Sequence, residues 1–128
     1  MSMRSEWQAA KAKAKTFNNG AEVKMAEKAD LGKLLDAYEA AQKAYEKAQS
    51  GEMNATWAKA AEALLKAAEE ANTAAVTYQQ GLPRVTANDQ AKHYLDSYLV
   101  MHVMAPIGKT RSDGTRLKPL IVKAKTKK

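Results

Sequence analysis

Two stretches of heptad spacing, separated by one break, constrain the fold of this chain more than any other feature. Apolar residues recur in steps of three and four, first at Leu31, Leu34, Tyr38, Ala41, Tyr45 and Ala48, then at Trp57, Ala61, Leu64, Ala68, Ala71, Ala75 and Tyr78. Such spacing places all the residues of a stretch on one helix face and is typical of a coiled coil. Ser50 and Gly51 interrupt the pattern, so the sequence predicts two long helices joined by a short turn.

Two amphipathic helices with a short connection fold back on each other in antiparallel orientation. We therefore predict a mainly α fold, with a long helical hairpin over residues 21–80 that brings Tyr45 against Trp57. Alanine supplies 26 of the 128 residues, so the two backbones can approach closely while the core stays thin. Gly81 and Pro83 form a typical helix stop at the end of this hairpin.

Shorter helices are predicted on both sides of the hairpin. Ser5 and Gln8 have the spacing of a capping box, which predicts a short amino-terminal helix. Thr86 and Asp89 have the same spacing, which predicts a further helix over residues 87–104. Residues 1–104 are therefore expected to form one helical domain.

The stretch from Tyr94 to Ile107 is the most apolar part of the sequence. It either fills the space over the alanine-rich hairpin or forms an interface between subunits. Because large apolar side chains are dense here, we predict that the chain forms a homo-oligomer through this stretch. The residues expected to mediate self-association are Tyr94, Tyr98, Leu99, Met101 and Met104.

Positive charge gathers in a carboxyl-terminal segment, residues 105–128. Its eight cations are opposed only by Asp113, and they are Lys109, Arg111, Arg116, Lys118, Lys123, Lys125, Lys127 and Lys128. The sequence leaves helix and strand open for residues 100–124. Asp113-Gly114 is a hairpin turn signal, so one of the two alternatives is a small β-hairpin with a loose end.

The charge distribution favours a polyanionic partner. The whole chain carries a net charge of +7, and the eight terminal cations can contact phosphates with little readout of base sequence. We therefore expect a non-enzymatic protein that binds nucleic acid through its basic segment and uses its helices for assembly. The alternative is a protein-interaction module, such as a virion scaffold, adaptor or small inhibitor, whose basic end docks on an acidic protein. The layout of a helical hairpin and a basic terminal module is similar to that of some phage scaffolding proteins.

Candidate sites for chemistry are few, and we predict no catalytic residues, no metal and no cofactor. Gly108-Lys109-Thr110 resembles the end of a phosphate-binding loop, but Val occupies position 103, where that loop requires Gly. Asp89, His93 and Asp96 share one helix face, which offers no cleft for a metal-dependent reaction. The chain contains no Cys.

The remaining sequence features concern location and the aromatic residues. With no long apolar run and no export signal, the sequence predicts a protein without a membrane span that is not secreted and stays in the cytoplasm or in a virion. The heptad aromatics can form either a core or a stacking platform for bases, and their spacing favours the core. They are Tyr38, Tyr45, Trp57 and Tyr78.

Overall fold

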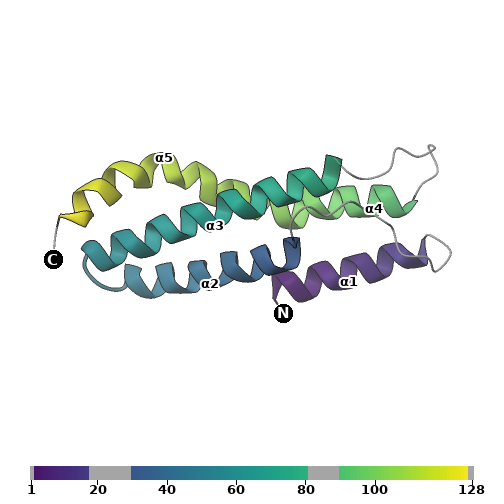
Figure 1. Cartoon of the computed structure of the whole chain (residues 1–128), viewed down its shortest axis with the longest axis horizontal. Coiled ribbons are helices and arrows are strands. Elements are labelled where there is room, and N and C mark those ends of the chain that lie inside the picture. The colour runs from purple at the N-terminus through teal and green to yellow at the C-terminus, as the bar shows by residue number, and fades with distance from the viewer. Residues whose placement is uncertain (1, 18–29, 81–89, 127–128) are drawn as a thin grey trace.

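The computed structural model of this chain describes residues 2–17, 30–80 and 90–126 (Figure 1). The helices within these ranges are α1 (Met3–Thr16), α2 (Leu31–Gln49), α3 (Ala55–Gln80), α4 (Gln90–Tyr98), the π-helical segment η1 (Leu99–Met104) and α5 (Ala105–Lys125). The prediction of a mainly α fold is confirmed. The described residues contain no strand, so the β-hairpin predicted in the basic segment is wrong.

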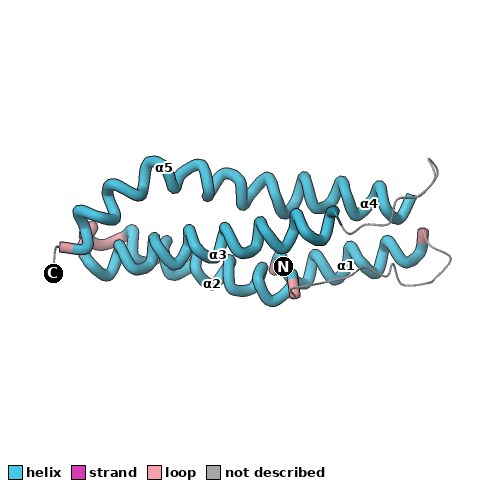
Figure 2. The backbone as a smooth tube through the Cα atoms, turned by 45° about the horizontal axis from the view of Figure 1, so that its top comes forward, coloured by secondary structure: helices cyan, strands magenta, loops and turns pink. Residues whose placement is uncertain are grey.

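The helices form an elongated bundle (Figures 1 and 2). α1 and α2 lie roughly end to end along one side. α3 runs antiparallel to α2 and extends beyond it to reach the level of α1. α4, η1 and α5 follow one another as one long helical path that lies beside α3 and curves within α5.

α1 begins one turn earlier than its predicted capping box. Its cap is Ser2 and not Ser5, because the Ser2 hydroxyl accepts a hydrogen bond of 3.1 Å from the Ser5 backbone N–H. One face of α1 points into the core, where Trp7, Ala10 and Ala14 are buried. α1 is thus amphipathic, as its sequence indicates.

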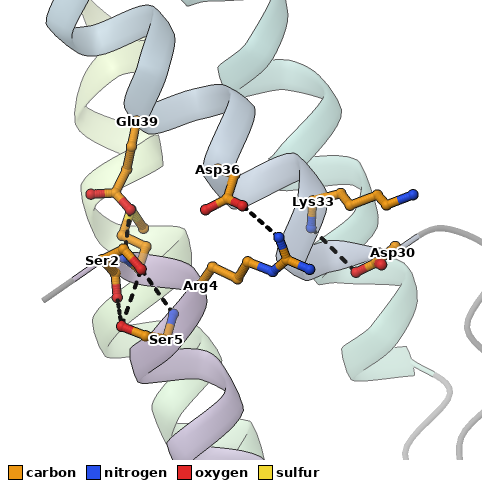
Figure 3. A network of polar contacts seen from close by, with 8 residues as sticks. Ser2, Arg4, Ser5, Asp30, Lys33, Asp36 and Glu39 are labelled. Atoms are coloured by element: carbon orange, nitrogen blue, oxygen red, sulfur yellow. Dashed lines mark hydrogen bonds and ion pairs between the residues drawn. The ribbon is translucent and has the colours of Figure 1, made fainter.

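Polar contacts attach the first turn of α1 to α2 (Figure 3). The Arg4 guanidinium lies 2.8 Å from the Asp36 carboxylate, and the Met3 backbone N–H donates to the Glu39 carboxylate. The backbone N–H groups in the first turn of a helix have no acceptor within that helix. The Glu39 carboxylate supplies the acceptor for the N–H of Met3. The contacts hold α1 and α2 end to end.

The turn between α2 and α3 is closed by Asn54. Its side-chain oxygen accepts hydrogen bonds from the backbone N–H groups of Thr56 and Trp57, at 3.0 and 3.2 Å. Tyr45 and Trp57, the rings predicted to meet, have centroids 6.1 Å apart. α3 ends at Gln80, where the hairpin is predicted to end. Residues 21–29 of the predicted hairpin, the helix stop Gly81 and Pro83, and the capping box Thr86 with Asp89 lie outside the described ranges.

The helix that begins at Gln90 does not end at residue 104, as predicted, but continues to Lys125. Pro106 and the Asp113-Gly114 hairpin signal both lie within this helix. Pro106 follows η1, where the Ala105 N–H bonds to the Val100 carbonyl five residues back. Gly114 is buried where α5 approaches α3, and a Cβ there would stand 3.1 Å from the Leu65 side chain. The Asp113-Gly114 pair therefore marks a close helix contact and not a turn.

The apolar stretch of this long helix fills the core over the alanines of α3. Leu95, Leu99, Val103 and Ile107 are buried at intervals of four residues. In an α-helix every fourth residue drifts by about 40° around the axis. The wider turn of η1 reduces that drift and keeps these side chains on the core side.

Candidate nucleic-acid interface

The cations of α5 fall into two rows. Residues seven apart lie two turns apart on nearly the same side of a helix, about 10.5 Å along its axis. The row that we call the inner row consists of Arg111, Lys118 and Lys125, and the row that we call the outer row consists of Lys109, Arg116 and Lys123. Lys127 and Lys128, also predicted to bind, lie outside the described residues.

The inner row faces α3 and is largely neutralised there. Arg111 lies 2.7 Å from Glu69, and Lys125 lies 2.7 Å from Glu62. Glu62 and Glu69 are seven residues, or two turns, apart on α3, whereas their partners Lys125 and Arg111 are fourteen residues, or about four turns, apart on α5. These side chains are 42–59% exposed, and pairs of that kind stabilise a fold by about 0–1 kcal/mol.

Lys118 is the inner-row cation without a carboxylate partner among the described residues. It borders an open groove of about 400 Å³ between α3 and α5. The residues that line this groove are Glu62, Leu65, Lys118, Ile121, Val122 and Lys125. Its floor is aliphatic, and its single carboxylate is engaged by Lys125.

The outer row faces solvent. Lys109, Arg116 and Lys123 are exposed, and none of them forms an ion pair within the described part of the chain. Asp113 lies one turn from both Lys109 and Arg116, without pairing with either. No carboxylate in the described ranges therefore forms an ion pair with any of the three outer-row cations.

Thr110 shows how this surface is fixed to the core. Its hydroxyl and the phenol of Tyr38 on α2 form a hydrogen bond of 2.6 Å, and Gln42 donates to the same phenol at 3.0 Å. Burial raises the pKa of Tyr38, and the bond with Thr110 partly offsets this rise. Because Gly108 and Thr110 lie inside α5, they do not form a phosphate-binding loop.

The residues predicted to mediate self-association lie mostly against the core. Leu99 is fully buried, whereas Tyr94, Tyr98 and Met104 are half-buried and pack on the main apolar cluster. Met101 is 65% exposed. The chain thus uses most of these side chains internally, and self-association through them stays a prediction.

The residues considered for metal binding are not brought together. Asp89 lies outside the described ranges, His93 is exposed, and the Asp96 carboxylate accepts a hydrogen bond of 2.6 Å from Gln79 on α3. Across residues 2–17, 30–80 and 90–126, no three His or acidic side chains are placed to hold a metal ion.

Three of the heptad aromatics, Tyr38, Trp57 and Tyr78, are buried, so these rings belong to the core. Over the described residues, no helix is long and apolar enough to cross a membrane.

The fold and the surface together define a helical protein that carries the outer row of cations along one long helix. Comparison with protein-family models, curated proteins and solved structures finds no match to this chain.

Proposed function

We propose that this protein is a non-enzymatic nucleic-acid-binding protein that contacts phosphates with the outer row of α5. The observation that carries the proposal is the regular placement of Lys109, Arg116 and Lys123 on the solvent side of a packed helix. A packed helix presents its charges at fixed spacing, so little chain ordering opposes binding.

The chemistry of the outer row favours affinity over sequence readout. Lysine and arginine contacts to phosphates release counterions, and the affinity therefore falls as salt rises. Such contacts position a protein on the nucleic-acid backbone but carry no base information. We expect the inner row to contribute less, since Glu62 and Glu69 already engage two of its cations.

A charge-matched pair of full-length variants tests this proposal. The outer-row variant carries Lys109→Gln, Arg116→Gln and Lys123→Gln. The control variant removes the same charge at exposed positions of α2 and carries Lys33→Gln, Lys43→Gln and Lys47→Gln. Both lower the net charge of +7 by three, so a difference between them reports position and not total charge.

The measurement is the affinity for a fluorescent oligonucleotide over a series of salt concentrations. Three lost phosphate contacts should reduce the slope of log affinity against log salt by about 2.7 on duplex DNA and by about 2.1 on a single strand. The control variant should keep most of the slope. Equal behaviour of the two variants would refute the proposal. Failure of every form to bind at low salt would favour the alternative, docking of the basic helix on an acidic protein.

A further inference from the structure

Aromatic rings form a continuous row along α4 and η1, on the part of the long helix that precedes the outer row. The row runs from Phe17, directly after α1, through Tyr94 and Tyr98 to His102. Successive ring centroids lie 5.7, 6.5 and 5.0 Å apart, within the usual range of aromatic contacts. The spacing of four residues between the last three rings follows the same period as the buried leucines.

Both ends of this ring row are open to solvent. Phe17 is 41% exposed and His102 is exposed, whereas the two tyrosines between them are half-buried. Tyr98 packs at 5.8 Å on the buried Trp7, which supports the middle of the row from the core side. The ring row therefore packs against the core at its centre and exposes an aromatic ring to solvent at each end.

Lysines of α1 stand beside the rings. The Lys13 ammonium lies 5.3 Å from the Tyr94 centroid, and the Lys11 ammonium lies 5.7 Å from the Trp7 centroid. Neither lysine forms an ion pair within the described ranges. Aromatic side chains with nearby cations are the combination by which proteins hold single-stranded nucleic acid, through base stacking and phosphate contacts.

The ring row and the outer row lie on the same flank of the long helix. Tyr94, Tyr98 and His102 each precede a core residue by one position, namely Leu95, Leu99 and Val103. Arg116 and Lys123 likewise precede the buried Leu117 and Ala124, and Lys109 precedes Thr110, which reaches Tyr38. From Tyr94 to Lys123 the flank extends for about 43 Å at 1.5 Å per residue.

We infer that the nucleic acid bound by this flank is single-stranded, with bases stacked on His102 and Phe17 and the backbone held by the outer row and by Lys11 and Lys13. Paired bases in a duplex stack on one another and offer these rings no free face, so a duplex engages the cations alone. The inference rests on the proposed function and adds to it the strandedness of the ligand and the residues that recognise bases.

The test compares three ligands of equal length, about 20 nucleotides, at one salt concentration. They are oligo(dT), the same backbone with abasic sites in place of bases, and a duplex. The full chain should bind oligo(dT) more tightly than the abasic strand. His102→Ala with Phe17→Ala should weaken oligo(dT) binding by about 5- to 150-fold for each base that loses its ring, and should leave abasic-strand binding unchanged.

Two further variants separate stacking from structural damage. His102→Phe with native Phe17 should retain oligo(dT) binding, because a ring face remains. Met101→Ala removes an exposed side chain next to His102 and should change nothing. Circular dichroism melting checks that each variant is folded.

The outcomes distinguish this inference from the proposed function. If oligo(dT) and the abasic strand bind equally, or if the double alanine variant binds oligo(dT) as the full chain does, the ring row has no role and the inference is overturned. Loss of affinity in the outer-row variant would still support phosphate binding in that case. If no ligand binds, both fail.

Discussion

The Arg111 guanidinium donates hydrogen bonds of 2.7 and 3.4 Å to the two carboxylate oxygens of Glu69, across the contact between α5 and α3. About four turns further along α5, Lys125 forms the same kind of pair with Glu62 at 2.7 Å. Glu62 and Glu69 of α3 thus neutralise two cations of the inner row, whereas the outer row on the other side of α5 has no such partners among the described residues.

Replacing both glutamates should increase nucleic-acid affinity. Glu62→Gln with Glu69→Gln releases Arg111 and Lys125 and raises the net charge by two. Each pair is largely exposed, so the free energy of unfolding should fall by less than about 1 kcal/mol per pair. Filter binding and urea unfolding measure the two effects. Glu46→Gln with Glu52→Gln, at exposed positions outside α3, gives the same charge change and should raise affinity less.

Leu99→Ala should destabilise the fold by about 2–5 kcal/mol, since it deletes a fully buried side chain from the main core. Met101→Ala, two residues away at a position that is 65% exposed, should change stability by no more than about 0.5 kcal/mol. Thermal unfolding compares them. A small effect of Leu99→Ala would mean that the segment serves an interface and not the core, and sedimentation equilibrium would then report the loss of an oligomer.

The two glycines of α5 should respond in opposite directions to a larger side chain. Gly114→Val crowds Leu65, because its Cβ alone would lie 3.1 Å from that side chain, and should destabilise the protein by about 1–3 kcal/mol. Gly108→Ala meets no neighbour within 4 Å and should stabilise the helix by up to about 1 kcal/mol. The denaturant concentration at the midpoint of unfolding should fall for Gly114→Val and rise for Gly108→Ala.

Stability should decline at alkaline pH partly through Tyr38. Burial raises the pKa of this phenol above its ordinary value of 10.0. The folded protein therefore keeps the proton to a higher pH than the unfolded chain does. The stabilisation is complete below that ordinary value and is lost as the pH rises through the folded-state pKa. Burial, with Glu6 and Tyr94, raises the pKa of Tyr98 in the same direction.

Urea unfolding at increasing pH measures this decline. Tyr38→Phe removes the ionising group, so its free energy of unfolding should fall less steeply above about pH 10 than that of the unmodified chain. Tyr45→Phe, at a half-buried position of the same helix, is the matched control. An identical alkaline slope in Tyr38→Phe and the unmodified chain would contradict the assignment.

The sequence was sufficient for the helical class and for the contact of Tyr45 with Trp57, because heptad spacing and a short turn leave few arrangements. It misled in α5, where Asp113-Gly114 has the local signature of a turn. The role of Gly114 depends instead on the close approach of Leu65 on α3, which is a tertiary feature. Local chemistry cannot distinguish a glycine needed for a turn from one needed for close packing.

The candidate interface was predictable in composition but not in arrangement. The seven-residue repeats of Lys109, Arg116 and Lys123 are visible in the sequence, whereas the neutralisation of the inner row depends on the register between α3 and α5. The four-residue spacing of Tyr94, Tyr98 and His102 is also visible in the sequence. Phe17 joins that row only because α1 packs beside α4, a contact between segments far apart in the chain.

Helical structure continues without a gap from Gln90 to Lys125. The number of residues that precede each cation in this helix therefore determines the side of the helix on which the cation lies. One residue inserted after Ile107 would rotate every later position by about 100°. Arg116 and Lys123 would move around the axis, and the cations that now face Glu62 and Glu69 would lose their partners. An insertion of seven residues there would keep the two rows on nearly the same sides of the helix and shift them by about 10.5 Å along its axis. Substitutions at the exposed positions of α5 are therefore tolerated far more readily than single insertions or deletions.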